Sequence, residues 1–344
     1  MPAGDHDINL IKRLLRIAMG VLVVVMTLVA CQLVRVVGQA RSLEKISDRE
    51  VKENLDIRGA GTSPAYPDSL WCAPDVAGIP GDEAGDLIRY GRELIAHTSV
   101  YLGPKGKVAQ ISNGMNCQNC HLNAGTKPFG INYSAVASTY PRFRHRSGTV
   151  EGFEKRINDC IERSLNGNPL PGKSREMRAM VAYLAWVGKD VRKGTAPMGA
   201  GLPNLPFLER AADPEKGKVH YNNKCVSCHG ADGQGLKDEN RVEWRYPPLW
   251  GDRSFNTAAG LFRISRLASF IRSNMPYGVS YNNPVLSVEE AWDVAAYITS
   301  MPRPHKEFAG DWPDIRHKPM DHPFGPYADG LSETMHKYGP FKKD

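Results

Sequence analysis

The sequence predicts an all-α fold built from two similar helical domains in tandem. The pattern C-x-x-C-H occurs twice, at residues 117–121 and 225–229. A helical pattern precedes each copy and an aromatic-rich helical pattern follows it, while a stretch rich in glycine and proline at 194–214 separates the two sets. With 344 residues and 41% apolar content, the chain is long enough for two domains with separate cores.

C-x-x-C-H is the attachment pattern for c-type haem, in which two cysteines form thioethers to the porphyrin and the histidine binds the iron. We therefore expect two covalently bound haem c groups. The expected attachment residues are Cys117, Cys120, Cys225 and Cys228, and the expected iron ligands are His121 and His229. A structural zinc site is the alternative, but the two cysteine pairs lie too far apart for one and both histidines would lack a role.

In the first domain, the helical spacing of apolar residues predicts a first helix over residues 83–98 and a closing helix over 176–187. Between them, Thr149 is expected to cap a helix that Asn166 and Gly167 terminate. This middle helix would carry one apolar face toward the core.

The second domain repeats this scheme in a shorter form, with a first helix at 217–221 and a closing helix at 288–301. A glycine at a helix contact permits close crossing. We expect such crossings at two glycine and tyrosine pairs, Gly91 with Tyr183 and Gly217 with Tyr297. This order of helices and haem motif is that of a class I cytochrome c domain, found twice.

The patterns divide the chain into six segments. They are a signal or membrane segment (1–40), a linker (41–75), cytochrome c domain 1 with the catalytic haem (76–193), a second linker (194–214), cytochrome c domain 2 with the electron-transfer haem (215–302) and a C-terminal extension (303–344). The extension has many prolines and no clear period, so we expect ordered coil that wraps the domains.

The N-terminus predicts export. Basic residues precede an apolar run at 17–34, as in a signal or anchor segment with the remaining chain outside. Three fates remain open: cleavage, lipidation at Cys31, or retention as an anchor. We expect a periplasmic protein that is tethered to the membrane through this segment.

The formal net charge of +7 is modest, and the chain lacks a dense basic run with interleaved aromatic residues. This argues against nucleic acid as a partner. A small anionic substrate agrees better with the charge.

The sixth ligand of each iron decides its chemistry. Met275 precedes a proline in a loop after the second motif, which indicates an axial ligand rather than a core methionine. The spacing from Met275 to Tyr297, transferred to Tyr183, points within one residue of Cys160. The alternatives at Cys160 are a small buried hydrophobe and a disulfide with Cys72.

A second alternative for the first haem is ligation by His145, which lies well upstream of Cys160. Arg156 lies one turn before Cys160 on nearly the same helix face, and a cation on that face requires an anion nearby. Arg146 belongs to a basic cluster at 142–146 that we expect to bind an anion rather than to be merely solvated.

Several sequence blocks together resemble the dihaem thiosulfate dehydrogenases that form tetrathionate. The resemblance extends over roughly residues 75–344, and the blocks are residues 113–122, 140–146, 156–167, 274–278, 323–329 and 337–341. It implies that Cys160 is an axial haem ligand and that Arg146 and Arg156 line the substrate pocket. The sequence departs from the family pattern at Asn274, where no lysine adjoins Met275 to compete for the iron.

The resemblance also implies a periplasmic enzyme that oxidises two thiosulfates to tetrathionate. Two electrons would pass from the His/Cys haem through the His/Met haem to an external acceptor, such as a cytochrome c. Two alternatives stay open: a cysteine-ligated haem protein that conjugates thiosulfate to a carrier thiol, as in the sulfur-oxidation complex, and a dihaem electron carrier without a substrate.

Overall fold

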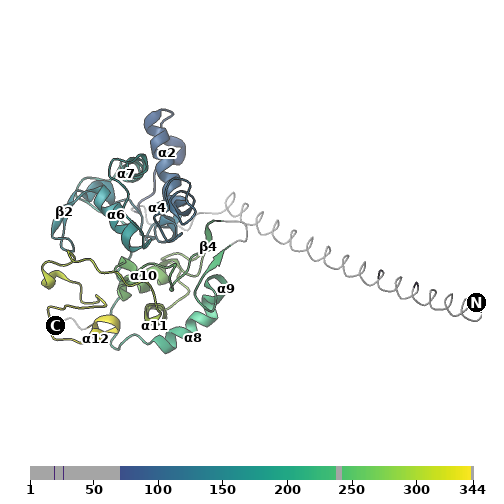
Figure 1. Ribbon diagram of the computed structural model, residues 1–344. Coiled ribbons are helices and arrows are strands. Elements are labelled where there is room, and N and C mark those ends of the chain that lie inside the picture. The colour runs from purple at the N-terminus through teal and green to yellow at the C-terminus, as the bar shows by residue number, and fades with distance from the viewer. Residues whose placement is uncertain (1–18, 20–25, 27–69, 238–241, 342–344) are drawn as a thin grey trace, which may run out of the picture. The chain divides into compact units, whose positions relative to one another are not determined.

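Two pairs of crossing helices form the framework of the fold in the computed structural model (Figure 1). α2 (Glu83–Ala96) packs on α7 (Arg175–Val187), and α8 (Pro214–Lys224) packs on α11 (Val288–Ser300). The structure describes residues 70–237 and 242–341, together with Met19 and Met26. The described residues from Leu70 onward belong to one compact unit.

Each of these four helices starts at a side chain that caps it. Asp82 accepts a hydrogen bond from the Gly85 N–H, and Ser174 accepts one from the Met177 N–H. The remaining caps are Asp213, followed by a proline in the first turn, and Ser287, which forms a capping box with Glu290. The predicted helices are therefore present, with ends that differ from the prediction by a few residues.

A glycine lies at each crossing, as predicted. A Cβ atom at Gly91 would lie 2.0 Å from the carbonyl oxygen of Ala179 and 2.8 Å from the Tyr183 Cβ. A Cβ atom at Gly217 would lie 1.8 Å from the Asp293 oxygen and 2.9 Å from the Tyr297 Cβ. No side chain fits at these distances, so the close approach of the helices requires glycine.

Short elements fill the space around the framework. In the first domain they are η1 (Val76–Gly78), α3 (Thr98–Leu102), η2 (Cys117–Asn119), α4 (Leu122–Gly125), α5 (Val136–Thr139), β1 (Arg142–Arg144), β2 (Thr149–Glu151) and α6 (Phe153–Arg163). In the second domain and extension they are α9 (Val226–His229), β3 (Leu236–Lys237), β4 (Trp244–Tyr246), η3 (Gly260–Phe262), α10 (Ile264–Asn274), η4 (Ile315–His317) and α12 (Glu333–Tyr338).

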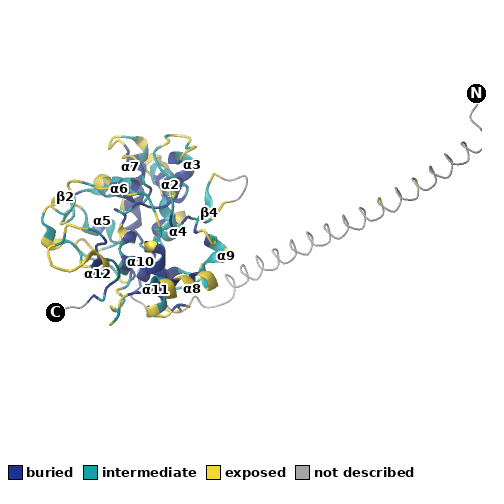
Figure 2. Cartoon of the chain, turned by 60° about the horizontal axis from the view of Figure 1, so that its bottom comes forward, coloured by how far each residue is buried: buried dark blue, intermediate teal, exposed yellow. Residues whose placement is uncertain are grey.

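Each domain has its own hydrophobic core. Tyr183 and Met180 belong to the first core, and Tyr221 and Trp292 belong to the second. Figure 2 shows buried residues along α10 and exposed residues along α8. Sheet among the described residues consists of two antiparallel pairs, β1 with β2 and β3 with β4, so the all-α prediction is confirmed.

The start predicted for the middle helix was wrong. Thr149 does not cap α6 but pairs with Arg144 in the β1–β2 hairpin, whose turn contains Gly148 in a left-handed conformation (φ +64°). α6 begins at Phe153 after Gly152, which provides no side-chain cap. A strand of three residues carries too short an alternation to be recognised from sequence.

The C-terminal extension contains more helix than expected, because η4 and α12 interrupt the predicted coil. Apart from Met19 and Met26, the apolar N-terminal run lies outside the described residues, and so does Cys31. None of the described helices has the length and apolar character that crossing a membrane requires.

Candidate active site

The histidines of the two C-x-x-C-H motifs are held in the same way. The Nδ1 atom of His121 lies 2.6 Å from the carbonyl oxygen of Ile131, and that of His229 lies 2.9 Å from the carbonyl oxygen of Pro247. Because a carbonyl oxygen can only accept, each Nδ1 carries the hydrogen and each Nε2 keeps its lone pair. Burial lowers the pKa of His121 to about 4 and also lowers the pKa of His229, so both rings stay neutral. Both histidines thus fit axial ligation of iron.

None of the six described cysteines forms a disulfide. Cys72 is exposed, and its thiol contacts the carbonyl oxygen of Leu70 at 3.8 Å. Cys160 instead lines a cavity. The alternative disulfide between Cys72 and Cys160 is therefore absent from the described residues. Two free cysteines and a neutral histidine in each motif are the donor set that a thioether-bound haem requires.

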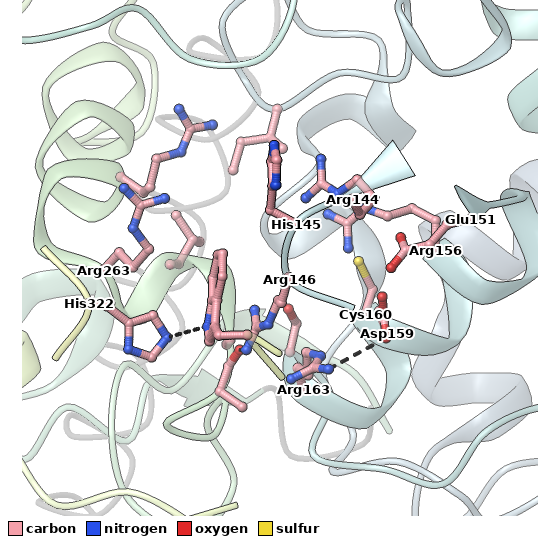
Figure 3. A pocket seen from close by; sticks show the side chains of 18 of the residues that line it. Arg144, His145, Arg146, Glu151, Arg156, Asp159, Cys160, Arg163, Arg263 and His322 are labelled. Atoms are coloured by element: carbon pink, nitrogen blue, oxygen red, sulfur yellow. Dashed lines mark hydrogen bonds and ion pairs between the residues drawn. The ribbon is translucent and has the colours of Figure 1, made fainter. Parts of the chain in front are cut away.

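A cavity of about 340 Å³ brings the first domain, the second domain and the C-terminal extension together (Figure 3). Cys120, His121 and Cys160 all line it, so the first haem motif and the predicted sixth ligand share one space. Seven arginines also line the cavity, against two carboxylates, Glu151 and Asp159. This excess of positive charge suits an anionic ligand.

Arg156 and Cys160 lie one turn apart on α6, and both face the cavity. Electrostatic attraction to Cys160 is the main reason that the pKa of Arg156 is raised. The Arg156 side chain forms no hydrogen bond to another described residue. Its donors are therefore available to an anion next to the Cys160 sulfur.

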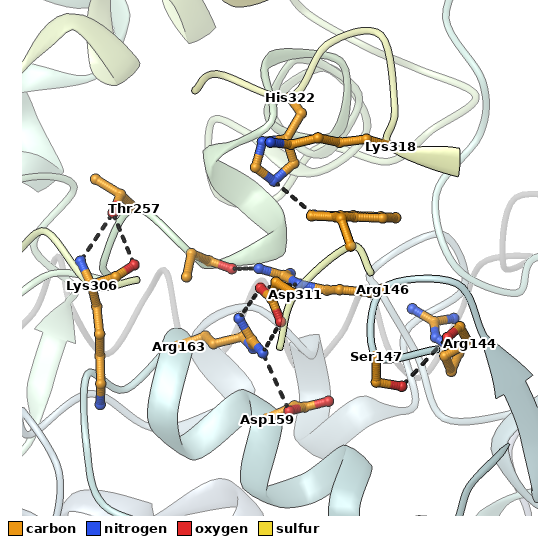
Figure 4. Close-up of polar contacts among 12 residues, drawn as sticks. Arg144, Arg146, Ser147, Asp159, Arg163, Thr257, Lys306, Asp311, Lys318 and His322 are labelled. Atoms are coloured by element: carbon orange, nitrogen blue, oxygen red, sulfur yellow. Dashed lines mark hydrogen bonds and ion pairs between the residues drawn. The ribbon is translucent and has the colours of Figure 1, made fainter. Parts of the chain in front are cut away.

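Arg146 also lines the cavity, but the protein itself holds it (Figure 4). Its Nε donates to Asp311 Oδ2 at 2.8 Å, and its Nη2 donates to the carbonyl oxygen of Ala258 at 2.8 Å. Asp311 also binds both Nη atoms of the buried Arg163, at 2.7 and 2.8 Å. A carboxylate from the extension therefore fixes two arginines of the pocket. His145, the alternative iron ligand, stacks on His317 of the extension with ring centroids 3.8 Å apart.

The comparisons with known proteins agree with this geometry. The family model "SoxA/TsdA, cytochrome c domain" matches residues 107–192, and the model "Cytochrome c" matches residues 214–302. A thiosulfate dehydrogenase of Psychrobacter arcticus is 34% identical over 292 residues, which cover 81% of this chain and 86% of the relative. A thiosulfate dehydrogenase of Allochromatium vinosum is 37% identical over 243 residues, covering 69% of this chain and 86% of the relative.

The chain belongs to the thiosulfate dehydrogenase family. Among solved structures, the as-isolated thiosulfate dehydrogenase TsdBA of Marichromatium purpuratum is similar, with a TM-score of 0.63 and 32% identity over 69% of this chain. The match spans 50% of that longer chain. As a member of the thiosulfate dehydrogenase family, the protein is an enzyme with two tandem cytochrome c domains and two covalently bound haem c groups.

In the present chain, Met275 lies directly after α10, and its backbone N–H donates to the Ile271 carbonyl oxygen at 2.8 Å. The side chains of Met275 and Cys225 both pack against the second core. Asn274 reaches into the first domain and donates to the carbonyl oxygen of Phe129 at 3.0 Å. The loop that carries the predicted ligand is thus fixed by contacts from both domains.

Sequence reasoning missed several residues of the pocket. Arg163 follows Arg156 by two helical turns, so a helical projection of α6 would have shown both on one face. Asp311 and the second-domain arginines Arg263 and Arg266 gave no comparable signal. Their place in the site depends on long-range packing.

Proposed function

We propose that this protein oxidises two thiosulfates to tetrathionate at Cys160 and releases two electrons to an external acceptor. The observation that carries the proposal is the shared cavity, in which Cys160, Arg156 and Arg146 meet the histidine of the first haem motif. The thiosulfate dehydrogenases similar to this chain support the same substrate.

In this proposal Cys117 and Cys120 would attach the first haem, and His121 and Cys160 would bind its iron. Cys225 and Cys228 would attach the second haem, and His229 and Met275 would bind its iron. When bound, the haems accept the electrons one at a time and pass them on. A thiolate ligand would lower the potential of the first haem and a methionine would raise that of the second, which would favour electron transfer toward the second haem.

Arg156 and Arg146 bind the sulfonate of thiosulfate through charge-assisted hydrogen bonds and direct the sulfane sulfur at Cys160. A sulfur–sulfur bond then forms between the Cys160 thiolate and the sulfane sulfur, with loss of two electrons. A second thiosulfate attacks the sulfane sulfur of this adduct. Tetrathionate leaves, and the Cys160 thiolate is restored.

We place the enzyme in the periplasm, where its acceptor is a cytochrome c or a similar redox protein. The apolar run at 17–34 supports export and a tether to the membrane. In this proposal, residues 76–193 form the first cytochrome c domain and residues 215–302 form the second.

Purified full-length protein with thiosulfate and an artificial one-electron oxidant tests the proposal. Product analysis should give one tetrathionate for every two thiosulfates consumed and two electrons transferred. If consumption of thiosulfate required an added carrier thiol, the activity would be that of a thiol-conjugating haem protein. Failure to consume thiosulfate under either condition would leave a simple electron carrier.

A further inference from the structure

Two arginines on the second-domain wall of the pocket have no role in the steps described above. Arg263 immediately precedes α10 and Arg266 lies in its first turn, and both line the cavity. Figure 3 shows Arg263 across the pocket from Arg156 and Cys160, with Arg146 between them. The positive charge of the pocket is therefore divided between two walls.

Arg263 is held in place by the C-terminal extension. Its Nε and Nη2 donate to Asp321 Oδ1 at 2.8 and 2.5 Å. Asp321 is itself buried, with 4% of its surface exposed, and accepts hydrogen bonds from the backbone and hydroxyl of Ser265. The guanidinium thus has a fixed position, and its Nη1 makes no hydrogen bond to another described residue.

Arg266 lacks such a partner. Among the described residues, none forms a hydrogen bond or ion pair with its side chain. Burial and then the neighbouring charge of Arg263 lower the pKa of Arg266, and the smaller opposing effect of the Asp321 carboxylate does not offset them. A half-buried cation next to a second cation is costly unless an anion binds there.

We propose that Arg266, supported by Arg263, forms a second anion subsite that holds the sulfonate of the attacking thiosulfate. This inference rests on the proposed function. Tetrathionate carries a sulfonate at each end, with two sulfane sulfurs between them. If one sulfonate lies at Arg156 beside Cys160, the other requires a separate cation on the far side of the reacting sulfur. The second-domain wall supplies that cation.

The step served by this subsite transfers a group without a change in electron count. The sulfane sulfur of the second thiosulfate bonds to the sulfane sulfur carried by Cys160. The bond between that sulfur and the Cys160 sulfur breaks, and its electron pair returns to Cys160 as a thiolate. Arg266 offsets repulsion between two anions that must approach each other, so it acts on this step and not on loading of Cys160.

The test compares wild-type holoenzyme with the Arg266→Gln and Arg156→Gln variants, given thiosulfate and a one-electron oxidant. Samples are quenched, and the mass of the Cys160 peptide shows whether it carries one thiosulfate unit. Arg266→Gln should load Cys160 normally, accumulate the adduct and lose at least about tenfold in kcat/KM for tetrathionate formation. Arg156→Gln should instead fail to load.

The exposed Arg253, which lies outside the pocket, provides the matched control, and Arg253→Gln should behave as wild type. Unchanged kinetics in Arg266→Gln would refute the subsite while leaving the proposed function intact. A shifted absorption spectrum or midpoint potential of the first haem in that variant would make Arg266 a partner of the haem, which also refutes the subsite. Wild-type protein that forms neither adduct nor tetrathionate would refute the proposed function itself.

Discussion

The two cytochrome c domains hold their motif histidines alike but surround them differently. In both, a helix pair crosses at a glycine and a backbone carbonyl receives the histidine Nδ1–H. Beyond this common part, the first motif opens onto a cavity with seven arginines, whereas Met275 packs against the core of the second domain. The repeated part of the sequence therefore builds two haem scaffolds. In the function proposed above, the part that is not repeated makes one of them a reactive site and the other an electron relay.

The largest expected effect comes from making the first site resemble the second. Cys160→Met retains a side chain that fills the volume and ligates iron but cannot form the covalent adduct. We expect both haems to remain, the potential of the first haem to rise and kcat to fall by at least about a hundredfold. Spectroelectrochemistry and the tetrathionate assay measure the two effects.

The control for this variant is Cys72→Ala, because Cys72 is exposed and bonded only to a nearby carbonyl oxygen. It should change neither the potential nor the rate. Turnover near the wild-type level in Cys160→Met would contradict covalent chemistry at this residue, even with thiosulfate as the substrate.

The second prediction concerns two arginines of the first domain that line the cavity at its haem motif. Arg156→Gln and Arg146→Gln should each reduce kcat/KM by at least about tenfold, since one charge-assisted contact contributes about 1.5–3 kcal/mol. Arg156→Gln should leave thermal stability nearly unchanged. Arg146→Gln should also lower it, because Arg146 binds Asp311 and the Ala258 oxygen. Equal kinetics in wild type and both variants would show that neither arginine takes part in substrate capture.

The repeated scaffold was predictable from sequence for a physical reason. Helix periodicity, caps such as Ser174 and the crossing glycines are local signals, and the repeat allowed Cys160 to be located from Met275. The pocket was only partly predictable. Tertiary packing brings Arg266 to the pocket and Asp311 to two of the pocket arginines. No local sequence pattern shows which carboxylate of an irregular extension will bind which arginine. The β1–β2 hairpin was missed because three-residue strands leave almost no periodicity.

A third prediction tests the relay. Met275→His should keep both haems and lower the potential of the second haem, because imidazole replaces the thioether. Loading of Cys160 in a single turnover should persist, since Met275 does not line the cavity, while steady-state transfer to the acceptor slows. Stopped-flow reduction of each haem separates these steps. Loss of Cys160 loading would show that the two sites are not divided as proposed.

The smallest expected effect on turnover comes from Asp311, which fixes the position of Arg146 in the first site. Asp311→Asn keeps the shape but removes the charge that holds Arg146 and Arg163. We expect a loss of about 1–3 kcal/mol in the free energy of unfolding. The KM for thiosulfate should rise by roughly threefold, with kcat retained, because a less ordered Arg146 captures the anion less well.

Asp311→Glu should recover part of both losses, because a carboxylate again faces the two arginines. Asp314→Asn is the matched control, since Asp314 lies in the same extension and its ion pairs are with Arg316 and His317, neither of which Asp311 holds. A lower KM in Asp311→Asn would mean that the carboxylate competes with the substrate for Arg146 rather than positioning it. The extension would then weaken anion binding in the first domain instead of preparing it.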